Sequence, residues 1–376
     1  MATTCVWDDL IGQRRVAGFL ERAVASDQVS HAYLFVGPIG AGKQTAARAL
    51  ACALLCDDGG CGHCGVCRRV RNGTHPDVMV TRPAGASSYI VSQVREVVHD
   101  VSLRPVEGKA KVYIIHEADR FNAESANAFL KTLEEPPAGV VFVLTAAQMD
   151  TVLPTIVSRC QVVRFSPVSS SAALDVLVER SGADPAEVRA ALAASDGIVP
   201  RALEFLRSPV RRQTRALVLD VLKRLTLMDG HDVLMAAREL LTAAKAPVAE
   251  LKQAQVAELA ERRELLGKGV STTTVEDRYK REVTARERES IIGLMSVTES
   301  WLRDCLMLVG GVDELVMNAD ETDAIQEVAA VITPQALLKA LDAVRRARRS
   351  ISYNVSPQLV VETMLFNIQE VFRCPR

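Results

Sequence analysis

A glycine-rich stretch near the start of the sequence has the spacing of a phosphate-binding loop. The apolar residues 33–36 run into the pattern G-x-x-x-x-G-K, which ends at Lys43 and is followed by helix-forming residues. In this strand–loop–helix context, backbone N–H groups turn inward on phosphate oxygens, the helix N-terminus adds partial positive charge, and the lysine reaches the β- and γ-phosphates. The candidate nucleotide-binding residues are Gly37, Gly40, Gly42, Lys43, Gln44 and Thr45.

The loop lacks both groups that normally support magnesium. Gln44 stands where a hydroxyl would bind the ion, and Thr45, one residue later, is turned away by about 100° around the helix. After a later apolar run, His116 stands in the place of the metal-directing aspartate, although Glu117 remains, so the pair forms a degenerate Walker B element. Because magnesium neutralises charge that develops on the phosphates, we expect ATP or ADP to bind weakly or not at all, magnesium to be poorly held, and the chain not to hydrolyse ATP by itself.

Five of the nine cysteines lie within one short segment, 52–67. Three of the last four have C-x2-C spacing, and glycines between them permit a tight turn. Four thiolates favour tetrahedral zinc and leave no open position for water, so the sequence predicts a structural zinc knuckle. Cys52 is an alternative first ligand, and His63, inside the turn, is expected to face solvent. The predicted ligands are Cys56, Cys61, Cys64 and Cys67.

The elements that must position these residues alternate between short apolar runs and helical patterns over the first ~165 residues, which is typical of a parallel sheet with crossover helices. Several runs are apolar throughout, as expected for strands covered on both faces. Residues 124–135 predict a helix that Pro136 and Pro137 end, with Ala126, Leu130 and Leu133 on one side. The expected strands are Tyr33–Val36, Val78–Val80, Lys111–Ile115, Val140–Thr145 and Gln161–Phe165.

No strand pattern follows residue 166. Residues 169–206 predict two or three short helices, and a helical pattern continues from about residue 210 to the end. Residues 250–289 are densely charged helix formers broken by Gly267-Lys268-Gly269, which indicates a solvated helical hairpin or a partly disordered excursion, since acids and bases alternate. The expected organisation is an α/β P-loop domain over 1–166, a small helical domain over 167–209 and an all-α domain over 210–376.

Composition limits the class of protein. A chain of 376 residues exceeds the size at which single cores commonly stop growing, so two or three domains are expected. The formal net charge of -1 gives no global field toward nucleic acid or membrane. The start lacks a charged region followed by an apolar stretch, and no apolar run approaches the ~20 residues that span a bilayer, so we expect a cytoplasmic protein without a membrane partner.

A series of motifs follows the chain in a recognisable order. They are VWDDLIGQ (6–13), HAYLF (31–35), the knuckle, GTHPD (73–77), ANAFLKTLEEPP (126–137) and LPTIVSRC (153–160). Together they resemble the bacterial clamp-loader subunits of the AAA+ class, which are part of the DNA polymerase III holoenzyme. The resemblance is dense over 6–165 and weaker beyond, where it implies that 167–209 is a helical lid and 210–376 a helical collar that joins subunits.

Departures from the family's motor pattern indicate which type of subunit the chain resembles. Motor subunits of the gamma/tau type keep the loop hydroxyl and an Asp-Glu pair, whereas this chain has Gln44 and His116, and the tau form also continues well past the collar. The delta type lacks the zinc knuckle and the Ser158-Arg159-Cys160 element. The resemblance is therefore to the delta-prime type.

This resemblance implies a regulatory and structural role. Arg159, flanked by Ser158 and Cys160, corresponds to an arginine that is aimed in trans at the ATP of a neighbouring motor subunit, where it offsets transition-state charge. The delta-prime type is the rigid stator of a heteropentameric ring that loads the sliding clamp onto primed DNA. The implied partners are the gamma/tau and delta subunits, with the beta clamp and primed-template DNA reached through the complex. No polymerase active site is expected in the chain.

The implied ring contacts predict apolar stripes on the C-terminal helices, although for each single residue ordinary packing inside the domain is the favoured interpretation. The candidates are Leu359, Val361, Met364 and Leu365.

Two other functions remain open. The chain is an active gamma/tau-type motor ATPase if it tolerates Gln44 and His116. The knuckle is a nucleic-acid module if Arg68, Arg69 and Arg71 contact a phosphate backbone, although no aromatic residues are interleaved to stack bases.

Overall fold

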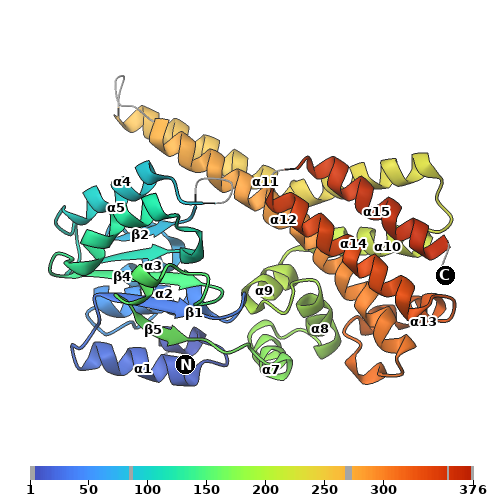
Figure 1. Cartoon of the computed structure of the whole chain (residues 1–376), viewed down its shortest axis with the longest axis horizontal. Helices are drawn as coiled ribbons and strands as arrows, with labels where there is room; N and C mark the ends of the chain where they lie inside the picture. Colours follow the sequence, from blue (N-terminus) through green and yellow to red (C-terminus); the bar gives the residue numbers. More distant parts are fainter. Residues whose placement is uncertain (1–4, 84–87, 267–272, 354, 374–376) are drawn as a thin grey trace. The chain divides into compact units, whose positions relative to one another are not determined.

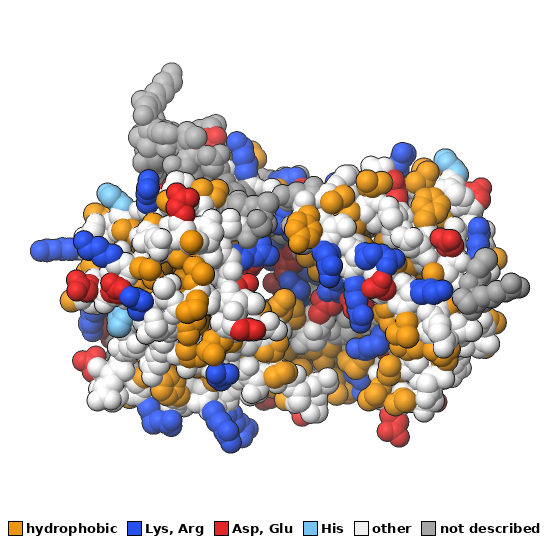
Figure 2. Space-filling model, in the orientation of Figure 1, with side chains coloured by type: hydrophobic (Ala, Val, Ile, Leu, Met, Phe, Trp, Pro, Cys, Tyr) orange, Lys and Arg blue, Asp and Glu red, His pale blue; other side chains and the backbone are white. Residues whose placement is uncertain are grey.

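The computed structural model describes residues 5–83, 88–266, 273–353 and 355–373 (Figure 1). The chain divides into two compact units, Met1–Ala173 and Leu174–Arg376. The first unit is α/β and the second is helical. None of the helices within the described ranges combines the length and apolar character that a membrane span needs. On the face drawn in Figure 2, acidic and basic side chains are interspersed over each unit, in keeping with a net charge near zero.

The first unit is built on a five-stranded sheet in the order β2-β3-β4-β1-β5. All neighbouring strands are parallel. The predicted parallel sheet is therefore confirmed, and each predicted strand agrees with the observed one to within a residue at either end. The strands are β1 (Ala32–Val36), β2 (Val78–Thr81), β3 (Lys111–Ile115), β4 (Val140–Ala146) and β5 (Gln161–Arg164).

Helices cover both faces of this sheet (Figure 1). Side chains alternate along β1, so that Tyr33 and Phe35 pack with η1, α1, α2 and α3 on one face, while Leu34 and Val36 pack with α4 and α5 on the other. Burial on both faces is why these strands are apolar throughout. The helices of this unit are η1 (Val6–Asp9), α1 (Arg14–Ala25), α2 (Lys43–Leu55), α3 (Gly65–Asn72), α4 (Val91–Val101), η2 (Ala118–Arg120), α5 (Ala123–Glu134) and α6 (Pro154–Val157).

Helix α5 shows how local sequence sets an element. Asn122 accepts a hydrogen bond from Ser125 N at 2.8 Å, and the Ser125 hydroxyl accepts one from Asn122 N at 3.1 Å, which forms a reciprocal cap. The helix ends at Glu134, shortly before the two prolines. Of the three residues predicted on one side, Ala126 and Leu133 are buried and Leu130 is half-buried, and Phe129 is buried beside them.

From residue 170 onward every regular element of the described residues is a helix, and three short helices occupy the segment where two or three were predicted. The separation of a lid over 167–209 from a collar over 210–376 stays a prediction. The elements are α7 (Ser170–Ser181), α8 (Pro185–Ala193), α9 (Val199–Arg207), α10 (Pro209–Arg224), α11 (Gly230–Leu266), α12 (Thr273–Val309), η3 (Asp313–Leu315), η4 (Ala319–Glu321), α13 (Thr322–Ala329), α14 (Pro334–Ser352) and α15 (Pro357–Arg373).

The charged segment 250–289 forms the ends of α11 and α12, which pack against each other. Gln255 and Tyr279 are buried there, so the pair of helices is not uniformly solvated. The predicted break at Gly267-Lys268-Gly269 lies outside the described residues.

Helix α15 separates the two interpretations of its apolar residues, a contact with another subunit and ordinary core packing. Val361, Met364 and Leu365 are almost fully buried within the second unit, so for these three the alternative of ordinary core packing is right. Leu359 is 57% exposed and remains a candidate for a contact with another subunit.

Candidate functional site

The phosphate-binding loop joins β1 to α2, at the carboxyl edge of the sheet. A Cβ on Gly37 would lie 2.5 Å from Phe165 O, so this position admits only glycine. Gly42 has φ +87° and caps α2, which begins at Lys43. The Lys43 ammonium donates hydrogen bonds to the carbonyl of Gly37 and, at 2.7 Å, to that of Pro38. Burial lowers the pKa of Lys43, and Asp119 acts in the opposite direction.

The position of the first magnesium ligand is held by an exposed amide. Gln44 Oε1 lies 3.5 Å from Nη2 of Arg82, while the half-buried Thr45 is one position further into α2. An amide oxygen beside a guanidinium binds a metal cation poorly, because the positive guanidinium repels the cation. Gln44 therefore does not replace the missing hydroxyl.

The position of the second ligand is held by a buried histidine. His116 is 4% exposed, and its Nδ1 lies 3.3 Å from the Thr145 hydroxyl on β4. Burial, followed by the charges of Arg82, Arg48 and Lys43, lowers the pKa of His116 to about 3, so the imidazole is neutral near pH 7. Magnesium prefers carboxylate, carbonyl and water oxygens. The residues present at these two positions therefore do not fit magnesium.

Glu117 survives at the degenerate Walker B element but is engaged elsewhere. Its backbone has φ 54°, in the left-handed region, and its carboxylate pairs with Arg120 at 2.7 Å. Its predicted part in the nucleotide site is untested.

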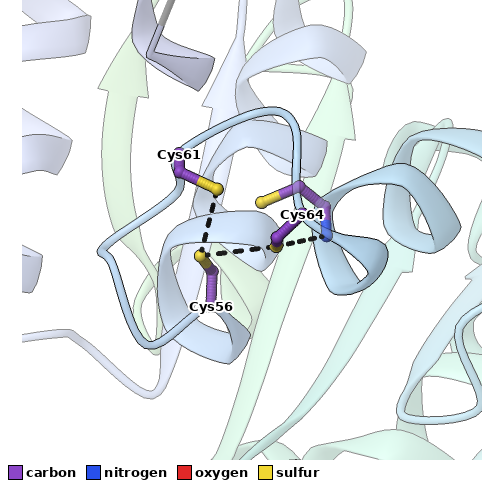
Figure 3. A group of neighbouring side chains, drawn as sticks. Cys56, Cys61 and Cys64 are labelled. Atoms are coloured by element: carbon purple, nitrogen blue, oxygen red, sulfur yellow. Dashed lines mark hydrogen bonds between the residues drawn. The ribbon is translucent and has the colours of Figure 1, made fainter. Parts of the chain in front are cut away.

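The four predicted zinc ligands come together at the end of α2. Figure 3 labels three of them, Cys56, Cys61 and Cys64. Their Sγ atoms all lie within 4.8 Å of one another, and the distances from Cys56 Sγ to the sulfurs of Cys61 and Cys64 are both 3.7 Å. Four sulfurs at about 2.3 Å from a tetrahedral zinc are separated by about 3.8 Å. The cluster that fits a metal such as zinc is Cys56, Cys61, Cys64 and Cys67.

The alternative ligand and the histidine of the turn lie outside this cluster. The Cys52 thiol donates to Cys67 O at 3.7 Å, and burial raises its pKa to about 11. Burial opposes ionisation of Cys56 as well, but N–H groups of the turn outweigh it and lower its pKa to about 7. His63 is exposed, as predicted. The structure therefore favours Cys56 over Cys52 as the first ligand.

The knuckle also anchors the start of the chain. Val6 N donates to Gly60 O at 3.1 Å, and Arg71 on α3 pairs with Asp9 of η1 at 2.7 Å. Arg69 pairs with Glu107. Two of the three arginines that a nucleic-acid contact would use are thus engaged within the chain.

Asp77, in the GTHPD motif, is a structural residue. Its buried carboxylate accepts hydrogen bonds from the N–H groups of Val106, Glu107 and Gly108 at 2.6, 2.9 and 2.7 Å. Burial opposes ionisation, but these three donors outweigh it and hold the pKa of Asp77 below its usual value. Asp77 therefore fixes the loop that leads into β3.

The Ser158-Arg159-Cys160 element lies between α6 and β5 on the surface of the first unit. The Arg159 guanidinium pairs with Glu134 at the end of α5, with Nε to Oε1 at 2.6 Å. It also donates to Thr155 O at 2.8 Å and to the Ser158 hydroxyl at 3.2 Å. Burial raises the pKa of the Cys160 thiol to about 12. Arg159 is the charged group of this element that reaches the surface.

Sequence reasoning missed the two further arginines beside the phosphate loop. Arg82 directly follows β2, and Arg48 lies on α2, one turn beyond the loop. The carboxyl ends of parallel strands meet at one edge of a sheet, so a cation just after a predicted strand was the available signal for Arg82. Its pairing with Gln44 required knowledge of the strand order.

Family models and known proteins match this chain in sequence. The family model "DNA polymerase III, delta subunit" matches residues 12–169, and "DNA polymerase III, delta subunit, C terminal" matches 287–370. DNA polymerase III subunit delta-prime of Bacillus subtilis is 36% identical over 222 residues, 58% of this chain and 67% of that protein. Its counterpart of Pseudomonas aeruginosa is 39% identical over 204 residues, 53% of this chain and 62% of that protein. The subunit tau of B. subtilis is 36% identical over 170 residues, 44% of this chain and 30% of that protein.

The parallel sheet, the phosphate loop after β1 and the helices on both faces define a P-loop domain of the AAA+ class. Within this class, the chain aligns with its delta-prime relatives over about two thirds of their length. The chain belongs to the delta-prime family of DNA polymerase III subunits.

Proposed function

We propose that this chain is the stator of a heteropentameric clamp loader and supplies Arg159 in trans to the ATP site of a neighbouring gamma/tau-type motor subunit. The observation that carries the proposal is a contrast within one unit. The chain's own loop has an amide and a neutral imidazole at the magnesium positions, whereas Arg159 presents a guanidinium at the surface. A subunit of this kind completes another subunit's chemistry rather than its own.

The partners, the structural zinc and the collar in this proposal are inferred from membership of the delta-prime family. The gamma/tau and delta subunits are the direct partners, and the beta clamp and primed-template DNA are reached through the ring. The cysteine cluster holds a structural zinc, since four thiolates leave no position for a reacting water. The helices of the second unit form the collar, with Leu359 as the exposed apolar candidate.

Reconstitution with motor and delta subunits tests this role. We expect rings that contain Arg159→Ala to assemble but to lose DNA-stimulated ATPase and clamp loading, because an arginine finger contributes about 10³-fold or more to turnover at its site. Arg164→Ala is the matched control, since Arg164 is an exposed arginine on the neighbouring strand β5. Unchanged loading by the Arg159 variant would remove this residue from the mechanism.

The similarity to tau subunits keeps an active motor ATPase as the second candidate. Steady-state hydrolysis by the purified chain separates the two. The stator proposal expects no magnesium-dependent turnover, and such turnover, abolished in Lys43→Ala, would contradict it.

A further inference from the structure

The residue after β2 brings a cation to the edge of the phosphate loop. The backbone carbonyl of Arg82 accepts a hydrogen bond from Gln93 Nε2 at 2.5 Å, which fixes the backbone at this point to α4. Its exposed guanidinium lies 3.5 Å from Gln44 Oε1. Within the described ranges no carboxylate forms an ion pair with Arg82, so its charge is available to a ligand.

Arg82 acts together with two other cations. Arg82, Arg48 and Lys43 each lower the pKa of His116, which places three positive charges around the position where a metal-directing carboxylate would stand. Nearby Asp119 acts on Lys43, and Glu117 is paired with Arg120. Cations thus predominate at the carboxyl edge of β2 and β3.

This charge distribution is the opposite of the one that a magnesium site needs. A divalent cation needs anionic or strongly polar oxygens and would be repelled by nearby guanidinium and ammonium groups. A phosphate chain needs the opposite surroundings: inward N–H groups, a helix N-terminus and cations. The loop supplies these from Gly37–Lys43 and the start of α2.

We propose that the loop binds the polyphosphate chain of a nucleotide without magnesium, with Arg82 contacting the phosphate oxygens that a metal ion would otherwise bridge. Gln44 lies beside that position and already faces Arg82. A planar guanidinium binds two phosphate oxygens at once, which an ammonium cannot do with the same geometry. When the nucleotide binds, the Lys43 ammonium gives up its hydrogen bonds to the carbonyls of Gly37 and Pro38 and donates to the phosphates instead. This inference goes beyond the stator role, because it concerns a ligand of the chain's own loop.

Calorimetric titration of the isolated full-length chain with ATP tests the proposal. In EDTA we expect binding at least as tight as in excess magnesium, because the metal-free nucleotide carries more negative charge. Arg82→Ala should weaken binding in EDTA by about ten- to a hundredfold, the usual effect of one charge-assisted hydrogen bond. Lys43→Ala should weaken it similarly, which locates the ligand in the loop.

Arg104→Ala is the matched control. Arg104 is exposed and follows α4, at the opposite edge of the sheet, so its removal changes the net charge equally and should alter affinity by less than about twofold. Thermal unfolding of each variant shows whether it is folded. Binding that requires magnesium, the absence of binding in EDTA, or an equal effect of Arg82→Ala and Arg104→Ala would each overturn the proposal.

A second variant tests the assignment of the lost metal site. The double substitution Gln44→Thr and His116→Asp restores an oxygen ligand at both positions and adds a negative charge among the three cations. We expect magnesium to strengthen its binding of ATP, in contrast to the wild type. If magnesium has the same effect on both proteins, Gln44 and His116 do not set the metal preference. All these measurements use the isolated chain, so their failure leaves the Arg159 proposal as it stands.

Discussion

The cysteine knuckle and the phosphate loop lie at opposite ends of one helix, yet only the knuckle has a complete set of metal ligands. The loop precedes Lys43 at the start of α2, and Cys56 caps its end. Four thiols within 4.8 Å match tetrahedral zinc, whereas Gln44 and His116 do not match magnesium. The residues of the knuckle therefore fit a metal ion, whereas those at the two magnesium positions do not.

The two regions also differ in how their polar groups are tuned, since the thiols favour a bound cation and the buried histidine does not. The thiols of the knuckle are arranged for one ligand, and their neighbours lower the pKa of Cys56 toward the thiolate form. His116, in contrast, is kept neutral by burial and by surrounding cations. One region is prepared to hold a cation and the other to exclude one.

The largest expected effect comes from breaking the complete site. Cys64→Ser should abolish stoichiometric zinc and lower the free energy of unfolding of the first unit by several kcal/mol, because metal binding is linked to folding. Metal analysis and denaturant unfolding measure the two effects. Trp7 lies in η1 beside the knuckle and Trp301 in the second unit, so fluorescence of a Trp301→Phe background reports the first unit alone.

Cys52→Ala is the control for this prediction, since Cys52 is a buried thiol outside the cluster. The control should retain zinc. Loss of zinc from the Cys52 variant together with retention in the Cys64 variant would show that the ligand set is wrong. In an assembled ring we expect zinc removal to loosen this unit without changing motor turnover.

A smaller effect tests the neutral state of His116. Because its pKa of about 3 in the folded chain is below the usual 6.5, its contribution to stability is present above pH 6.5 and is lost as pH falls toward 3. Between pH 6.5 and about pH 4.5 this loss amounts to at most about 2.7 kcal/mol. His116→Gln should flatten the pH dependence of the unfolding free energy over this range.

Exposed His31→Gln is the matched control for that experiment. Part of the slope should persist in the His116 variant, because burial also lowers the pKa of His75. A His116 variant with the same slope as the wild type would mean that the imidazole is not held neutral by the fold.

The smallest effect concerns the connection between the two regions. Arg48 on α2 donates to Arg71 O at 3.2 Å, and the Arg71 side chain pairs with Asp9 across a half-exposed surface. Arg71→Ala removes the ion pair and keeps the carbonyl, so the unfolding free energy should fall by about 1 kcal/mol or less. A larger loss, or weakened ATP binding in this variant, would show that knuckle and loop are coupled.

Much of the first unit could be predicted from the sequence because its signals are local. Buried parallel strands are apolar runs, so the run at Lys111–Ile115 predicts β3 with its observed bounds. The spacing of the cysteines predicts the knuckle, and the residues that flank the loop predict the start of α2. Each of these features depends on residues that are close in the chain.

The remaining features depend on which distant segments become neighbours. Arg82 follows β2 and Gln44 follows β1, and they meet although β3 and β4 lie between these two strands in the sheet. Arg159 follows α6 and meets Glu134 because α6 packs against α5. On α15 the pattern showed apolar positions, but it did not show that Val361 packs inward whereas Leu359 remains exposed. Such distinctions follow from packing rather than from spacing.

The contacts of Arg159 have a consequence for its conformational entropy. Fixing a free arginine side chain costs up to about 2 kcal/mol of rotamer freedom. Here Glu134, Thr155 O and Ser158 already hold the guanidinium within the isolated chain. In the proposed ring the side chain would therefore exchange one exposed carboxylate for phosphate oxygens with little further ordering. If Arg159 acts in trans as proposed, its guanidinium would be positioned before the subunits meet, so alignment of the subunits rather than a search by the side chain would limit catalysis.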